Sequence, residues 1–241
     1  MLKATILYGN MHKGSTWHCA DLLKQALSAA GEAEYTEFYL PRDLQQFCNG
    51  CFSCFYNGEQ TCPHSAQVQP IVAAMEASDV VVLASPVYAL DVTGQMKTFL
   101  DHLCYMWVSH RPNPLMFHKV GVSIVTTAGA GLSHTAKTLN NSFDFWGFKR
   151  RFTLKNGVAA SKWAEVSEKK QQKLKQQTER LAAKITRAVR REKQLRPRLF
   201  TQFFFNLMKG AMKNNNDWNP TDRKHWEANG WLDGRSPFKR A

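Results

Sequence analysis

Four cysteines stand close together in the sequence, with the spacing Cys48-x2-Cys51-x2-Cys54-x7-Cys62. Thiolates are the ligands of iron–sulfur clusters, and a C-x2-C-x2-C run followed by one later cysteine is close to the spacing around a [4Fe–4S] cluster. Structural zinc sites more often use paired C-x2-C knuckles separated by a longer loop. The run therefore favours a cluster over zinc. Redox-active or structural thiols without a cluster are the other interpretation, and the spacing alone does not decide between them.

A second candidate site is the segment GNMHKGST, which joins a strand-like run to a helical one. The free N–H groups and positive dipole end of a helix N-terminus attract phosphate, and glycines let the backbone come close. Neither G-x-G-x-x-G nor the Walker pattern is present, so the alternative is an ordinary loop with Ser15 as the helix N-cap. The residues of the predicted phosphate loop are Asn10, His12, Lys13, Gly14, Ser15 and Thr16.

Two further loops follow apolar runs. Ser85-Pro86-Val87-Tyr88 comes after DVVVLA, and TTAGAG, which begins at Thr126, ends the run VGVSIVTT. Pro86, Val87 and Tyr88 offer an apolar wall, and the glycines allow close backbone approach. Next to a phosphate-binding loop, these two segments could contact the two sides of a planar cofactor ring.

These loops need elements to position them, and the first two-thirds of the chain alternates strand and helix patterns. Apolar β-forming runs indicate strands, and apolar residues at helical spacing indicate helices. The predicted strands are Lys3–Tyr8, Ala33–Leu40, Asp79–Ala84, Val120–Thr127 and Phe152–Ala160. The predicted helices are Ser15–Ala30, Ala66–Ala77, Thr93–Val108, Gly131–Phe145 and Ala164–Arg191.

Such alternation predicts βαβ units and an α/β fold, because parallel strands need crossover connections. Five units in this length fit a flavodoxin-like doubly wound sheet of five parallel strands, in the order 2-1-3-4-5, better than a barrel. Strands one, three and four are then neighbours, so their carboxyl-end loops would form one cleft. We expect a flavodoxin-like domain over residues 1–192 and a C-terminal extension over residues 193–241.

At this point the sequence resembles a family. GNMHKGST, SPVYALDVTGQMKTFLD and VTTAGAG are similar to the flavin-contacting segments of the NAD(P)H-dependent FMN reductase and iron–sulfur flavoprotein group, a likeness that covers about residues 3–160. The resemblance implies non-covalent FMN, NADH or NADPH as the reductant, and a homodimer or homotetramer. It places the phosphate on the predicted phosphate loop and the flavin ring against Pro86, Val87, Tyr88, Thr127, Ala128 and Gly129.

The sequence departs from the family at one position, and the resemblance also includes the cysteine run. His12 stands where the family usually has arginine, and histidine is only partly charged at neutral pH. The cysteine spacing resembles the cluster motif of iron–sulfur flavoproteins, although similar cysteines occur in relatives that use flavin alone. The implied ligands of a [4Fe–4S] cluster are Cys48, Cys51, Cys54 and Cys62, whereas Cys19 and Cys104 on predicted helices are expected in the core.

The charge of the chain is unevenly spread. The net charge is +13 over 241 residues, yet residues 1–148 carry −3 and residues 149–241 carry +16. Nucleic acid is not indicated, because no nucleic-acid motif accompanies the charge and much of it fits a solvated helix. The aromatic extension, with Phe203–Phe205, Trp218, Trp226 and Trp231, is expected to pack first on a second subunit, next on the flavin cleft, and last on an anionic membrane.

The sequence therefore predicts a cytoplasmic, FMN-dependent NAD(P)H oxidoreductase that passes electrons to a quinone, a flavin or another small acceptor. The flavin carries the chemistry, so no side chain is named as catalytic. The alternatives are an iron–sulfur flavoprotein that moves single electrons and a carrier with no substrate of its own. The apolar runs are too short for a membrane span and the N-terminus has no signal-peptide pattern, which is why we expect the cytoplasm.

Overall fold

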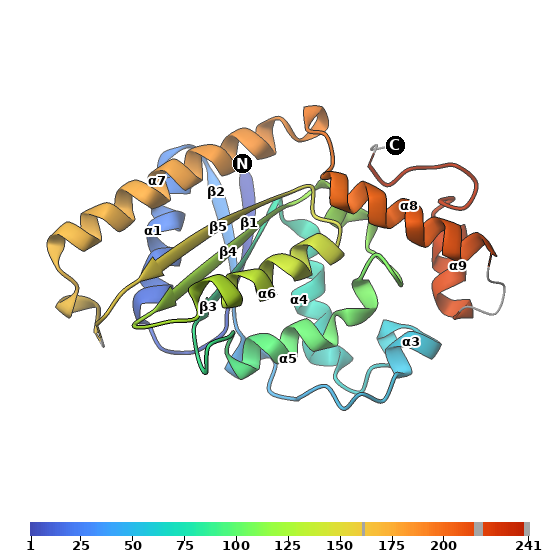
Figure 1. Cartoon of the computed structure of the whole chain (residues 1–241), viewed down its shortest axis with the longest axis horizontal. Coiled ribbons are helices and arrows are strands. Elements are labelled where there is room, and N and C mark those ends of the chain that lie inside the picture. Colours follow the sequence, from blue (N-terminus) through green and yellow to red (C-terminus); the bar gives the residue numbers. More distant parts are fainter. Residues whose placement is uncertain (161, 215–218, 239–241) are drawn as a thin grey trace.

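A parallel sheet in the order β2-β1-β3-β4-β5 forms the centre of the fold, as predicted (Figure 1). The computed structural model describes residues 1–160, 162–214 and 219–238. The strands are β1 (Leu2–Tyr8), β2 (Ala33–Tyr39), β3 (Val80–Pro86), β4 (Val120–Thr127) and β5 (Arg150–Gly157).

The strands differ in burial according to their place in the sheet. β3 and β4 are buried on both faces, which suits their nearly continuous apolar sequences, whereas β2 at the edge alternates between exposed and half-buried residues. The register pairs Tyr8 with Ala84 and Pro86 with Thr126. The carboxyl ends of β1, β3 and β4 therefore lie next to one another.

Helices cover both faces of the sheet. α1 (Ser15–Ala29) and α7 (Glu168–Arg190) pack on the face that carries Ile6, Val82 and Ile124. The other face, with Leu7 and Leu83, is covered by α4 (Ser65–Ala77), α5 (Gly94–His102) and α6 (Leu132–Phe145). Two shorter helices, α2 (Leu40–Asp43) and α3 (Ser53–Asn57), lie in the segment between β2 and α4.

Several predicted bounds were wrong by a few residues. Thr93 lies outside α5 as its N-cap, and its hydroxyl accepts from the Met96 N–H. α5 ends at His102 and a short 3₁₀ helix, Cys104–Met106, follows, so the predicted single helix to Val108 is two elements. β5 begins before Phe152 and ends at Gly157, and Ser167 caps α7 with its side chain.

The C-terminal extension packs Phe205, Trp226 and Trp231 on its own chain, which corrects the expectation that a second subunit would bury these three residues, whereas Phe203 stays exposed. It forms α8 (Leu199–Asn214) and α9 (Pro220–Ala228), which lie at the end of the molecule near α3 in Figure 1. Phe205, Trp226 and Trp231 form a buried cluster with Val108 and Phe117 of the main body. Trp218 lies outside the described residues.

Within residues 1–160, 162–214 and 219–238, no helix combines the length and the apolar character that a membrane crossing requires.

Candidate functional site

The loops that follow β1, β3 and β4 are bonded to one another at the carboxyl edge of the sheet. The Thr93 hydroxyl donates to the Gly9 carbonyl at 2.7 Å, and the Val87 N–H donates to the Thr126 carbonyl at 2.9 Å. The Asn10 amide reaches the Tyr88 hydroxyl at 3.4 Å. The three segments that were predicted to share one cleft are therefore neighbours.

The first loop presents the N-terminus of α1 without a side-chain cap among the described residues. Gly14, rather than the predicted alternative Ser15, is the N-cap residue, and the first turn carries no acidic side chain. The His12 ring lies against Gly14, because a Cβ there would come within 2.7 Å of His12 Cδ2. His12 and Lys13 are exposed, and the Lys13 ammonium lies 5.2 Å from the Trp17 ring centroid. The free N–H groups and nearby positive charge suit an anion.

Thr16 is placed differently from the other residues of the predicted phosphate loop. Its side chain is buried, and its hydroxyl lies 2.6 Å from the Thr126 hydroxyl. The hydroxyl therefore ties α1 to the end of β4, while Ser15, which is half-buried, remains the hydroxyl of the first turn that is open to a ligand.

The second loop makes a tight turn with a strained backbone. The Tyr88 and Asp91 backbones bond to each other, while Ala89 and Leu90 between them have φ values of 47° and 67°. Residues other than glycine seldom adopt positive φ, and such strain concentrates at functional sites. The turn leaves the Tyr88 ring exposed beside Asn10, as a ring-binding side chain requires.

The third loop is shaped by its own polar contacts. The Thr127 hydroxyl accepts from the Gly129 N–H at 3.1 Å and donates to the Ala130 carbonyl at 2.9 Å, and Ala128 is exposed at the tip. Gly131 has a φ of 90°, and a Cβ there would lie 2.7 Å from Val87 Cγ1. Gly131 thereby lets the third loop pack directly on the second.

These observations fit the shape and charge of a flavin mononucleotide. The α1 N-terminus offers N–H donors for a phosphate, and the exposed Tyr88 and Gly129 on the two neighbouring loops are the surfaces against which a planar ring would pack. His134 is exposed near this edge, and its Nε2 lies 3.4 Å from an Asp91 carboxylate oxygen. The residues at the carboxyl edge are thus compatible with the predicted cofactor.

We predict that Ser15→Ala weakens FMN binding at least about tenfold, because a hydrogen bond to a charged group contributes about 1.5–3 kcal/mol. Thr16→Val is the matched variant: it should lower the free energy of unfolding by about 1–3 kcal/mol through loss of a buried bond, with a smaller effect on FMN. Isothermal titration with FMN and chemical denaturation measure the two effects. Equal FMN affinity in Ser15→Ala and wild type would contradict the phosphate assignment.

The cysteine run lines a separate cavity of about 200 Å³. All four predicted ligands contribute, and so does Cys104, which was expected in the core but is half-buried and faces this space. Cys19, by contrast, is fully buried as predicted. Most of the exposed lining is apolar. Five thiols around one apolar cavity are a donor set that suits iron in a cluster.

The raised pKa values of Cys54 and Cys104 argue against a nucleophilic role for these two thiols. Burial raises the pKa of Cys104 to about 12, and the neighbouring thiols of Cys54 and Cys48 act in the same direction. The pKa of Cys54 is raised mainly by burial and next by Cys62, against a lowering by Arg111. Reactive thiols need a lowered pKa. A bound cation would relieve the mutual repulsion of these thiolates.

Two histidines lie beside the cysteines and were missed as site residues. His64 Nδ1 is 3.0 Å from His102 Nε2, and His102 Nδ1 is 2.8 Å from the Thr98 carbonyl. Ligand atoms of Cys62, His64 and His102 lie within 4.8 Å of one another. Burial lowers the pKa of His102, which favours the neutral, metal-binding form. The position of His64 two residues after Cys62 was the one signal in the sequence.

The flavin loops and the cysteine cavity lie at opposite ends of α5. Thr93 at its beginning bonds to Gly9, whereas Asp101 and His102 at its end line the cavity. A helix of this length rises about 13 Å. α5 is therefore the element that connects the two sites.

Comparison with known proteins gives a family match. The model of the family described as NADPH-dependent FMN reductase matches residues 2–165. An iron–sulfur flavoprotein of Archaeoglobus fulgidus is 34% identical over 148 residues, which are 61% of this chain and 64% of that protein. The match thus spans less than two thirds of the length of this curated relative. The resemblance read from the three loop segments is confirmed.

Solved structures share the fold. An azoreductase from Bacillus anthracis has a TM-score of 0.58 at 13% identity, over 76% of this chain and all of its own. An NAD(P)H:quinone oxidoreductase from Methanothermobacter marburgensis has a TM-score of 0.55 at 13% identity, over 75% of this chain and 95% of its own. At such identities the similarity establishes the flavodoxin-like fold alone.

Proposed function

Because the chain belongs to the NADPH-dependent FMN reductase family, we propose that it is a cytoplasmic, FMN-dependent oxidoreductase. It takes a hydride from NADH or NADPH and passes electrons to a quinone, a flavin or another small acceptor. The proposal includes residues 1–192 as the flavin-binding domain and residues 193–241 as its extension. When bound, the flavin supplies the redox chemistry, and the protein supplies binding and orientation.

The observation that carries this proposal is the mutual bonding of the three loops at the carboxyl edge. Thr93 holds Gly9, Asn10 meets Tyr88, and Thr126 accepts from Val87, so the loops form one prearranged surface. Ser15 and the α1 N–H groups bind the phosphate, while Tyr88 and the backbone at Gly129 orient the ring. Preorganised loops lower the entropic cost of binding a cofactor.

Steady-state oxidation of NADH and NADPH with a quinone as acceptor tests the activity. Sustained consumption of nicotinamide that requires both FMN and the quinone supports the oxidoreductase. Intact FMN binding without any such consumption would leave the electron carrier as the function instead.

A second function is favoured by the thiol-lined cavity, namely single-electron exchange between a [4Fe–4S] cluster and FMN. Cys48, Cys51, Cys54 and Cys62 are the proposed ligands, in the spacing that also suggested the cluster. The curated relative from Archaeoglobus fulgidus is itself an iron–sulfur flavoprotein. The cluster would extend the oxidoreductase proposed above and does not replace it.

We also propose a homodimer or homotetramer. Met11, Tyr88 and Leu90 around the flavin loops are at least half exposed, and a second subunit would cover them. Sedimentation equilibrium of the FMN-bound protein measures this directly. A monomer at micromolar concentration would contradict it.

We further propose that the exposed face of α8 makes a peripheral contact with anionic membranes. Leu199, Phe203 and Leu207 lie along one side of the helix, and Arg196 and Lys213 near its ends are exposed. The helix contains no acidic residue, so self-association through this face would bring positive charges together. Apolar residues flanked by basic ones are typical of an interfacial helix.

We predict that Phe203→Glu reduces co-sedimentation with phosphatidylglycerol vesicles roughly fivefold or more, because it places a charge at the centre of the apolar face. Leu115→Glu, at an exposed leucine outside α8, should leave co-sedimentation unchanged. Phosphatidylcholine vesicles serve as the neutral surface. If Phe203→Glu instead alters only the oligomeric state, the face is a protein interface and the membrane proposal is wrong.

A further inference from the structure

The C-terminal helix α9 is bonded to the carboxyl end of α3, the short helix that carries Cys54. The last carbonyls of any helix lack partners within the helix itself. The Asn219 amide donates to the Phe55 carbonyl at 2.8 Å, and the Thr221 hydroxyl donates to the Tyr56 carbonyl at 2.6 Å. Residues more than 160 positions apart in sequence thus complete the end of α3.

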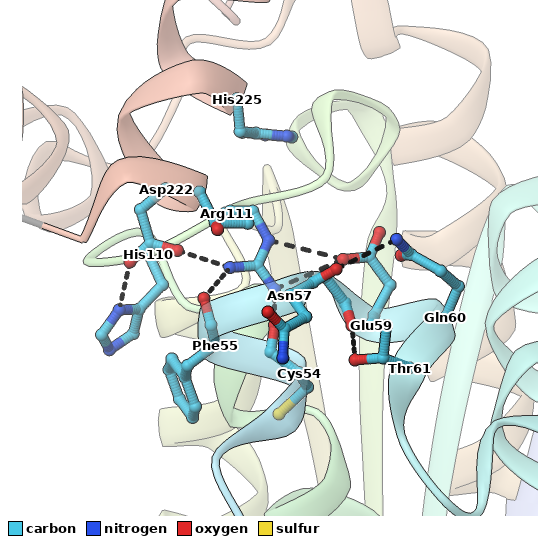
Figure 2. A network of polar contacts seen from close by, with 12 residues as sticks. Cys54, Phe55, Asn57, Glu59, Gln60, Thr61, His110, Arg111, Asp222 and His225 are labelled. Atoms are coloured by element: carbon cyan, nitrogen blue, oxygen red, sulfur yellow. Dashed lines mark hydrogen bonds and ion pairs between the residues drawn. The ribbon is translucent and has the colours of Figure 1, made fainter.

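Arg111 joins α9 to Cys54 at the centre of this contact (Figure 2). Its side chain is 5% exposed; one terminal nitrogen donates to the Cys54 carbonyl and the other to Asp222 Oδ1 at 2.5 Å. Glu59 Oε2 lies 3.3 Å from the guanidinium. Asp222 itself is fully buried, and its second oxygen lies 2.8 Å from His110 Nδ1. Each polar group of the pair therefore has a defined partner.

The contacts of Arg111 restrict the Cys54 backbone, because Arg111 is bonded to Cys54 and to Asp222 at the same time. A guanidinium presents a planar fork of donors, so it can bond a carboxylate and a carbonyl at once in one orientation. Removing one member of a buried ion pair leaves the other charge uncompensated. The orientation of the Cys54 backbone is thereby linked to the docking of α9.

We propose that Arg111 and Asp222 are positioning residues for the cysteine site, through which the C-terminal helix α9 holds the Cys54 backbone in place. The proposal rests on the cysteine site assigned above, but it makes a statement about the thiols that holds without a cluster. Undocking of α9 would release the end of α3 and open the cavity. The extension would then be part of the redox site and not an appendage.

Two variants separate positioning from simple electrostatics. Arg111→Lys keeps the positive charge but lacks the fork that reaches Cys54 and Asp222 together. Asp222→Asn keeps the shape and removes the charge that orients Arg111. Glu227→Gln, at an exposed residue of the same helix, makes the same change of charge as Asp222→Asn and is the matched control.

The measurement is the rate of iodoacetamide alkylation of each cysteine in the reduced, metal-free full-length protein, resolved by mass spectrometry across neutral and alkaline pH. Positioning predicts that Arg111→Lys and Asp222→Asn both raise the high-pH plateau rate of Cys54 roughly tenfold, because local opening exposes it. Glu227→Gln should stay within about twofold of wild type. Buried Cys19 should stay unreactive in every folded variant.

Other outcomes overturn the proposal. If Asp222→Asn only moves the pH midpoint of Cys54 and Arg111→Lys has no effect, Arg111 acts through its charge alone. Plateau rates equal to wild type in both variants would likewise contradict positioning. Should both variants fail to fold, Thr221→Val removes a single bond to Tyr56 without a buried charge, and an unchanged Cys54 plateau there would overturn the proposal.

Measurements of FMN affinity and iron content distinguish a failure of the positioning proposal from a failure of the proposed function. The flavin loops lie at the far end of α5, so FMN affinity should be unchanged in all folded variants. If wild-type protein prepared without oxygen contains no iron, the proposal of a cluster is wrong. The plateau rates of alkylation still decide whether α9 positions Cys54. If iron is present, Asp222→Asn and Arg111→Lys should lose at least half of it while Glu227→Gln retains it.

Discussion

Replacing Cys51 with serine should abolish iron and acid-labile sulfide in protein purified without oxygen, while FMN remains bound. Cys51 lines the cavity together with the other three predicted ligands. A hydroxyl is a much poorer ligand than a thiolate for cluster iron. The flavin loops do not contain Cys51, so FMN affinity should stay within about twofold, well below the effect of one lost hydrogen bond to a charged group. Iron, sulfide and flavin are measured on the same sample.

Cys19→Ala is the control for the loss of a cysteine. Cys19 is buried on α1, and it is not among the residues that line the cavity, so this variant should keep its iron. Iron that survives in Cys51→Ser would contradict the ligand assignment. Zinc without sulfide in the wild type would instead point to a mononuclear site at Cys62, His64 and His102.

The second large effect is expected from Gly9→Ala. A Cβ at Gly9 would lie 2.5 Å from Thr93 Oγ1 and 3.2 Å from Met96 Cβ. The added methyl would displace the hydroxyl that bonds the Gly9 carbonyl and caps α5. We expect FMN affinity to fall by at least about tenfold and the free energy of unfolding to fall by about 1–3 kcal/mol.

Gly94→Ala, at the first residue of the same helix α5, is the matched control, because a Cβ there meets no atom within 4 Å. Alanine favours a helix over glycine, so this variant should be as stable as wild type or more stable by up to about 1 kcal/mol. Equal losses in both variants would show that the effect of Gly9→Ala does not come from the contact with Thr93.

Much of the fold could be predicted because its signals are local. The apolar runs that became β3 and β4 are flanked by Ser-Pro and Thr-Thr-Ala-Gly loops, which mark strand ends at the carboxyl edge. The spacing of the cysteine run predicted that its thiols lie together, and Cys48, Cys51, Cys54 and Cys62 line one cavity. The end of α5 at His102 was missed because no glycine or proline follows it.

The remaining features depend on contacts that no local pattern encodes. The partner of Arg111 lies 111 positions away at Asp222, so the pair could not be read from spacing. The aromatic residues of the extension predicted that it packs against another surface, but their hydrophobicity does not identify that surface. Val108 and Phe117 of the same chain pack with Trp226 and Trp231, so for these two residues the second subunit was the wrong expectation.

The central claim is that one chain holds FMN and a cluster and is reduced by a nicotinamide. The most direct test is an anaerobic titration of the purified protein with NADPH, and separately NADH, followed by its visible spectrum and by iron and sulfide analysis. We predict bleaching of the flavin bands by one of the two nicotinamides, together with a broader cluster absorbance that Cys51→Ser removes. A spectrum without flavin, bound flavin that neither nicotinamide reduces, or protein that contains no iron and sulfide would contradict the account.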